Sequence, residues 1–110
     1  MLRRELVAAS AEPMILALLA KGENYGYGIL REIERASGDQ IAWTEGMLYP
    51  VLHRLERAGK IRAQWRETEA GRRRKYYGIS PKGKTALAQM LDEWSLVYRA
   101  LTDLTELRHV

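Results

Sequence analysis

Residues 44–59, with the sequence TEGMLYPVLHRLERAG, decide the fold of this chain. Thr44 is a favourable N-cap for a helix, and Gly59 suits the left-handed turn that closes many helices. Apolar side chains recur between them at steps of three and four residues, the spacing of a helix that buries one face. These apolar residues are Leu48, Val51, Leu52 and Leu55. We therefore predict a helix that packs on a core with one side and presents its polar side to a partner.

Pro50 interrupts this pattern, because it has no backbone N–H to donate. Inside a helix that loss costs about 3 kcal/mol. The helix therefore either bends at Pro50 or has its regular part begin near Tyr49, and the sequence leaves both alternatives open.

Two strand-like runs follow the presenting helix. Residues 61–66 alternate apolar and polar side chains, which is the pattern of a half-buried strand. The side chains expected to face the helices are those of Ile61, Ala63 and Trp65. Residues 73–80 form the second predicted strand, after a loop at residues 67–72. Because two strands alone are marginally stable in water, this hairpin must lie against the helices.

Two helices are predicted before the presenting helix. Pro13 is well placed at the first position of one, whose apolar residues 14–20 would lie at the centre of the core. Residues 1–12 would precede it as a short helix or a loose arm. A second helix is predicted over residues 25–37, with two glycines that weaken its first turn. They indicate either close packing of the helix against another helix or a phosphate, or a glycine-rich loop that simply turns.

A long helix is predicted from Pro81 to about Leu107, because Ser80 and Pro81 are a favourable N-cap and first-turn pair. Its apolar residues recur about every three and a half positions, which indicates a coiled-coil-like seam. An exposed seam of this length would promote aggregation of a monomer, so we expect it to pack on a second copy in a symmetric dimer. The residues expected at that interface are Leu87, Leu91, Trp94, Val97, Tyr98, Leu101 and Leu104. The alternative is packing on the chain's own core, most plausibly for residues 87–91.

The expected fold class is mainly α with a small β-hairpin. It is a winged helix-turn-helix followed by a long C-terminal dimerisation helix. The first unit would cover residues 1–80, including an N-terminal arm at 1–12, and the dimerisation helix would cover residues 81–110.

The composition excludes several classes of function. The chain has 18 Lys and Arg against 14 Asp and Glu, a net charge of only +4, but four of the basic residues are consecutive at 72–75. Cysteine is absent, which excludes disulfides and thiolate chemistry. The two histidines have neither a triad-like nor a metal-like neighbour pattern, so we predict no enzyme, metal or cofactor. The longest apolar run is too short to span a bilayer and no secretory signal precedes it, so a cytoplasmic protein without membrane contact is expected.

Three stretches resemble the PadR-like family of transcriptional regulators. They are GENYGYGILREIE at residues 22–34, TEGMLYPVLHRLERAGKI at 44–61 and GRRRKYYGISPKGKTAL at 71–87. The resemblance covers about residues 14–91. It implies a winged helix-turn-helix dimer that usually acts as a repressor, and that in some members leaves DNA when a small aromatic compound binds. The single terminal helix resembles the compact subfamily, whose members dimerise through that helix.

A helix in the major groove reads bases through its N-terminal residues, and a wing reaches the neighbouring backbone or minor groove. The residues expected at DNA are Tyr27, Thr44, Glu45, Gly46, Met47, Tyr49, Pro50, His53, Arg54, Arg72, Arg73, Arg74 and Lys75. Glu45 would either accept from a cytosine amino group or stabilise the helix start by its charge. Tyr49 would either bind a phosphate through its hydroxyl or pack against the second helix, and the resemblance favours the phosphate. The basic run would neutralise phosphate or be a solvated charged face.

The expected function is that of a sequence-specific DNA-binding transcriptional regulator, a dimeric repressor. Two presenting helices related by a two-fold axis require two related half-sites, so the expected partner is a near-palindromic operator. Trp94 and Tyr98 are candidate contacts for a small planar aromatic effector, while the alternative for Trp94 is to fill the dimer core. The alternative function is a protein-interaction module whose basic hairpin binds an acidic protein.

Overall fold

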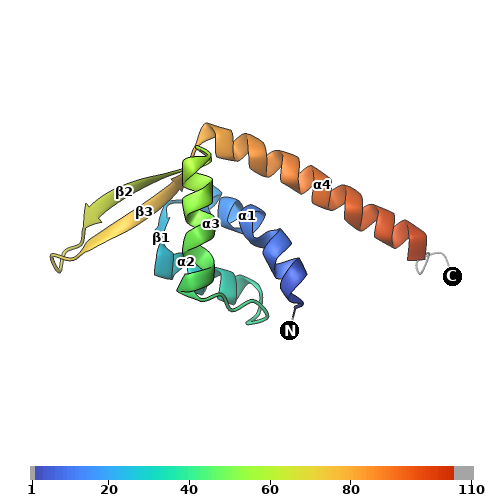
Figure 1. Ribbon diagram of the computed structural model, residues 1–110, viewed down its shortest axis with the longest axis horizontal. Helices are drawn as coiled ribbons and strands as arrows, with labels where there is room; N and C mark the ends of the chain where they lie inside the picture. The colour runs from blue at the N-terminus through green and yellow to red at the C-terminus, as the bar shows by residue number, and fades with distance from the viewer. Residues whose placement is uncertain (1, 106–110) are drawn as a thin grey trace.

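The structure is a computed structural model that describes residues 2–105 (Figure 1). Within that range its elements are α1 (Arg4–Lys21), β1 (Asn24–Tyr25), α2 (Gly26–Ala36), α3 (Glu45–Arg57), β2 (Ile61–Glu67), β3 (Arg73–Ile79) and α4 (Pro81–Thr105). Helices α1 to α3 form the body, the β2–β3 hairpin leaves it on one side, and α4 extends away on the other. The predicted fold class, mainly α with a small hairpin and a long C-terminal helix, is confirmed.

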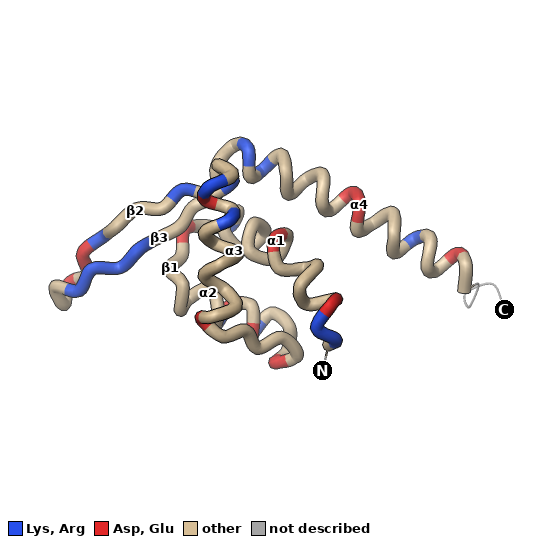
Figure 2. The backbone as a smooth tube through the Cα atoms, in the orientation of Figure 1, with Lys and Arg blue, Asp and Glu red and all other residues tan. Residues whose placement is uncertain are grey.

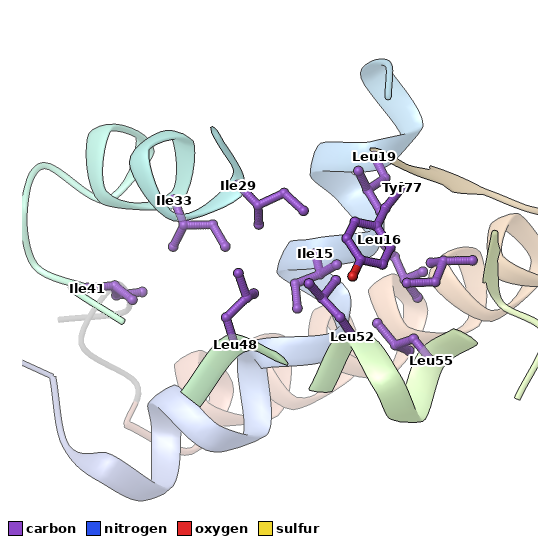
Figure 3. Close-up of a cluster of buried hydrophobic side chains, with 11 residues drawn as sticks. Ile15, Leu16, Leu19, Ile29, Ile33, Ile41, Leu48, Leu52, Leu55 and Tyr77 are labelled. Atoms are coloured by element: carbon purple, nitrogen blue, oxygen red, sulfur yellow. The ribbon is translucent and has the colours of Figure 1, made fainter. Parts of the chain in front are cut away.

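The core is built by side chains from all three helices of the body, from the linker before α3 and from the hairpin (Figure 3). Its buried members are Ile15, Leu16, Leu19, Ile29, Ile33, Ile41, Leu48, Leu52, Leu55, Ile61 and Tyr77. Three of the four residues predicted as the inner stripe of α3 are buried, and Val51 is partly buried against them. The predicted inner face of the presenting helix is therefore confirmed.

The predicted ends of α3 are also confirmed. The Thr44 side chain accepts a hydrogen bond from the backbone N–H of Met47 at 3.3 Å. At the other end Gly59 adopts φ +76°, and the Lys60 N–H donates to the Leu55 carbonyl at 2.9 Å, which closes the helix. The helix already begins at Glu45, so the alternative of a regular part that starts near Tyr49 is wrong.

Pro13 does not begin a helix, contrary to the prediction. It lies inside α1, which starts at Arg4, so residues 4–12 are a helical extension rather than a loose arm. A proline inside a helix removes one backbone hydrogen bond. Ala11 and Ile15, on either side of Pro13, are both buried, and this apolar burial offsets the lost bond.

The sheet has a third strand that was not predicted. β1 pairs antiparallel with β3, with Asn24 opposite Tyr77 and Tyr25 opposite Tyr76, and gives the strand order β1-β3-β2. A strand of two residues is too short to show alternation, so periodicity could not detect it. Its consequence is that the start of α2 lies beside the wing.

The prediction for Trp65 was wrong. Ile61 is buried and Ala63 is partly buried, as expected, but Trp65 is 56 % exposed. The hairpin extends past the helices, so its outer half has no helix to pack against (Figure 1). Alternation identifies which side chains share a face, but not whether another element covers that face.

The start of α4 is tied to the end of α3 through Ser80. The Ser80 hydroxyl donates to the Gly59 carbonyl at 2.6 Å and accepts from the Gly83 N–H at 3.1 Å, which confirms the predicted N-cap. The Ser80 N–H donates to the Lys60 carbonyl at 3.0 Å. The base of the wing, the end of α3 and the first turn of α4 therefore meet at one buried serine.

Only the first part of α4 packs on the body. Ala86, Leu87 and Met90 contact the core, whereas nearly every described residue from Leu91 onward is exposed. The radius of gyration is 16.1 Å, compared with about 13 Å for a compact domain of this size. Leu107 and the predicted end of this helix lie outside the described residues. No helix within residues 2–105 is long and apolar enough to cross a membrane.

Candidate nucleic-acid interface

The polar side of α3 is open to solvent along most of its length. The predicted site residues on this helix and at its cap are all exposed: Thr44, Glu45, Gly46, Met47, Tyr49, Pro50, His53 and Arg54. They lie opposite the buried leucine stripe, so the same helix that fills the core presents this surface. Glu45 occupies the first turn, next to the unpaired N–H groups of the helix start.

Tyr49 packs against α2, which was one of the two roles predicted for it. Its hydroxyl lies over Gly26, where an added Cβ would be 2.3 Å from the oxygen, so a larger residue at position 26 would force the Tyr49 ring to move. Gly28 is packed in a similar way, because a Cβ there would lie 2.1 Å from the Asn24 side-chain oxygen and would displace that side chain. The two glycines therefore serve close packing at a helix start. Within residues 2–105 the Tyr49 hydroxyl has no hydrogen-bond partner, and the phosphate role stays a prediction.

This arrangement predicts the effect of Tyr49→Phe. The variant should keep the melting temperature of the parent, because the ring keeps its packing on α2. Its affinity for duplex DNA should fall by about tenfold, the usual effect of losing one hydrogen bond to a charged group. Fluorescence anisotropy with a labelled duplex measures the affinity, and circular dichroism measures the melting. Parental affinity would restrict Tyr49 to packing, and Tyr49→Leu, which also removes the ring, serves as the destabilised control.

The basic run at residues 72–75 is divided between the two faces of the wing. Arg73 and Lys75 lie on the same face as Trp65, while Arg74 lies on the face of Tyr25 and Tyr76. Figure 2 shows these residues following β3 to the wing tip. The same alternation was already present in the sequence and could have separated the two arginines.

Aromatic rings hold these cations. The Arg74 guanidinium lies 4.4 Å from the ring centre of Tyr25, and that of Arg73 lies 5.1 Å from the ring of Trp65. Arg66 lies 5.2 Å from Tyr76, which itself meets Tyr25 edge to face. Contacts of this kind orient a guanidinium while its N–H edges stay free to donate. None of these ring partners was predicted from the sequence.

Several cations near the interface already have carboxylate partners. Lys75 Nζ lies 3.5 Å from Glu56 on α3, and Arg54 Nε lies 3.7 Å from Glu12 on α1. Arg66 pairs with Glu23 from the loop before β1. Within residues 2–105, by contrast, Arg72, Arg73 and Arg74 have no ion pair. These three arginines are therefore the cations of the predicted set that would have no ion pair to break before contacting a phosphate.

Two further tyrosines, Tyr77 and Tyr27, lie in contrasting surroundings, one buried and one exposed. Burial raises the pKa of the Tyr77 hydroxyl above its usual value, with nearby Tyr49 and Glu56 adding to the effect, so this core tyrosine stays neutral. Tyr27 is exposed on α2, where its hydroxyl accepts a hydrogen bond from Arg31 at 3.0 Å.

The loop at the tip of the wing is held by hydrogen bonds between Thr68 and Arg72.

A second surface lies on α4, away from α3 and the wing. Its exposed apolar residues are Leu91, Trp94, Leu96, Val97, Tyr98, Leu101 and Leu104. All but Leu96 were predicted to form a seam, and Leu96 lies off that seam. Leu87, also assigned to the interface with a second copy, packs on the chain's own core and is only partly exposed.

A capped helix with a free polar face, next to a basic two-stranded wing, defines the winged helix-turn-helix class of proteins. Residues 15–89 match the family described as "Transcriptional regulator PadR-like family", and the chain belongs to that family. Its members are DNA-binding transcriptional regulators and not enzymes, which confirms the predicted family and class.

Relatives in several bacteria support this assignment. The chain is 35 % identical over 86 residues to the transcriptional regulator Rv3488 of Mycobacterium tuberculosis, covering 78 % of this chain and 77 % of that one. It is 33 % identical over 97 residues to an uncharacterized protein of Lysinibacillus sphaericus, covering 88 % and 89 %. A transcriptional regulator from Clostridium thermocellum superposes with a TM-score of 0.86 at 30 % identity, over 94 % and 97 % of the two chains. A PadR-like regulator from Bacillus cereus gives 0.80 at 26 %, over 92 % and 96 %.

Proposed function

We propose that this regulator is a repressor that binds a near-palindromic operator as a dimer and is released by a small planar aromatic compound. The observation that carries the proposal is the separation of two surfaces. The polar face of α3 lies on the body and the basic wing extends from one side of it, whereas the apolar seam lies on the part of α4 that projects from the other side. Two copies could therefore pair through α4 while each keeps its α3 free for a half-site.

This separation assigns the two functions to different parts of the chain. Residues 1–80 would carry the DNA contacts, and residues 81–110 the contacts with the second copy. On α3 the N-terminal residues Glu45 and Met47 would reach base edges, with His53 further along the groove. On the wing, Arg72, Arg73 and Arg74 would neutralise phosphate.

The experiment that tests this proposal is selection of bound duplexes from a random library, followed by footprinting and light scattering. We expect an enriched motif with two related half-sites, whose centres are separated by about one helical turn, ~34 Å, or a multiple of it. Two chains should occupy each site. A monomer that binds an asymmetric site with full affinity would contradict the dimer. Placing the selected motif over the promoter of a reporter should lower its transcription when the protein is expressed.

The effector would bind where the two copies of α4 meet. Trp94 and Tyr98 are exposed on that helix, four residues apart on one face. Across a two-fold axis each tryptophan would come near its symmetry mate, which makes a slot for a flat ring. Stacked aromatic pairs contribute about 0.5–1.5 kcal/mol beyond simple burial, so two indoles would add to the affinity for a planar compound.

Trp94→Ala separates this role from simple filling of the dimer core. As a pocket wall, its loss should leave the dimer intact and abolish tryptophan quenching by planar cationic or phenolic compounds. A core residue would instead cost about 3–5 kcal/mol and dissociate the dimer. Sedimentation and quenching titrations, measured side by side, distinguish the two outcomes. Trp65→Phe, on the wing, is the matched control. It lacks the fluorescence of Trp65, but the compound should quench its remaining tryptophans as it does in the parent.

A further inference from the structure

Trp65 is a large apolar side chain that the fold does not use. It is 56 % exposed and lies outside the core cluster, in the outer half of β2. Its partner across the hairpin is Lys75, and its ring is held on one side by Arg73 at 5.1 Å. The other side of the indole faces no aromatic or cationic partner among the described residues.

The position of Trp65 relates it to α3. Lys75, directly opposite it, reaches Glu56 of α3 at 3.5 Å, so this face of the wing looks toward the presenting helix. Trp65 and Arg73 lie further out on the same face, past the end of the helical body. A duplex lying on the polar side of α3 would therefore be flanked by this indole. Tyr25 and Tyr76 lie on the opposite face of the sheet.

We propose that Trp65 is a DNA-contact residue. The free part of its ring packs against deoxyribose carbons at the edge of the groove next to the one that α3 enters, while Arg73, seated on the ring, donates to a neighbouring phosphate. Sugar edges present apolar C–H surface that an indole covers without any base-specific hydrogen bond. The assignment rests on the proposed placement of the duplex along α3 and the wing.

An apolar contact has a signature that differs from that of a cation. Each phosphate contact that is lost lowers the log–log slope of affinity against salt by about 0.9. Trp65 carries no charge, so Trp65→Ala should weaken binding without changing the slope. Covering about 60 Å² of the ring corresponds to about tenfold in affinity. Because sugars are common to all sequences, the loss should be equal for the selected operator and for a random duplex.

The experiment combines these affinities with fluorine NMR of the parent protein labelled with 5-fluorotryptophan. The chain has three tryptophans, so three resonances are expected, each assigned by its Trp→Phe variant. Trp65 should show a large solvent isotope shift between H₂O and D₂O that is lost when duplex is added. Trp65→Phe should bind duplex DNA with an affinity within about twofold of that of the parent, because the phenyl ring can make the same apolar contact as the indole. Arg73→Ala, the comparison variant, should lower the salt slope.

Either of two results overturns the assignment: a Trp65 resonance that keeps its isotope shift in the complex, or a Trp65→Ala variant with parental affinity. The parent measurement needs no substitution, so it does not depend on whether a variant folds. A parent that binds no duplex at all overturns the proposed function and this contact together. If the parent binds DNA while Trp65 stays in solvent, only the proposed Trp65 contact is overturned, and the proposed function stands.

Discussion

Replacing Gly83 with alanine should destabilise the fold by about 3 kcal/mol or more, the upper end for overpacking. A Cβ at this position would lie 2.0 Å from the Lys60 carbonyl oxygen and 2.8 Å from Cγ1 of Ile79. The carbonyl is backbone and cannot rotate away, and it already accepts a hydrogen bond from Ser80. Relief therefore requires the first turn of α4 to move off the end of α3, which breaks the Ser80 junction.

The matched control is Gly46→Ala, which makes the same change in the first turn of α3. A Cβ there would meet only the Thr44 hydroxyl, at 3.7 Å. Alanine is favoured over glycine inside a helix, so this variant should gain about 0.5–1 kcal/mol. Urea unfolding followed by circular dichroism measures both midpoints. If Gly83→Ala unfolds at the midpoint of the parent, the close approach of α4 to α3 is wrong.

Replacing Leu101 with glutamate should convert the proposed dimer into a monomer. Leu101 is 56 % exposed and lies seven residues after Trp94, on the same side of α4. In a two-fold interface the substitution would bring two carboxylates together in an apolar seam, where unpaired charge is strongly unfavourable. Affinity for a two-half-site operator should fall by about a hundredfold or more, because each chain then binds without the gain from linkage. Affinity for a single half-site should change little.

Leu96→Glu is the control for this prediction. Leu96 is 62 % exposed on the same helix, but it lies five residues before Leu101, or about 140° around the axis. The same change at nearly the same exposure should therefore leave the dimer intact. Light scattering gives the mass, and anisotropy with one-site and two-site duplexes gives the affinities. Equal behaviour of the two variants would show that the seam does not form the interface.

The prediction of the body succeeded where the signals are local. The N-cap at Thr44, the C-terminal turn at Gly59 and the N-cap at Ser80 each depend on hydrogen bonds that span only a few residues. The stripe of α3 depends on helix period alone. Short-range rules could not detect β1, since two residues become a strand only when β3 lies beside them.

The candidate site was identified as a set of residues, while its arrangement was not predicted. Residues 72–75 were predicted as one basic run, although the alternation of a strand sends Arg73 and Arg74 to opposite faces, and strand pairing decides which aromatic ring each one meets. Tyr49 was assigned either to packing or to phosphate, and only its approach to Gly26 shows that the ring packs on α2. Pairing of Arg54 with Glu12 likewise joins side chains far apart in the chain.

The sequence by itself determined the order of the helices and of the two hairpin strands, the buried side of α3, the basic wing and the family. Each of these is encoded by residue type and by spacing along a few turns of chain. The tertiary structure alone decided that Pro13 is inside a helix, that Trp65 is in solvent and that α4 is bare from Leu91 onward. Whether another element covers a face depends on where distant helices and strands end. The spacing of residues within one segment carries no information about the length of the elements beside it.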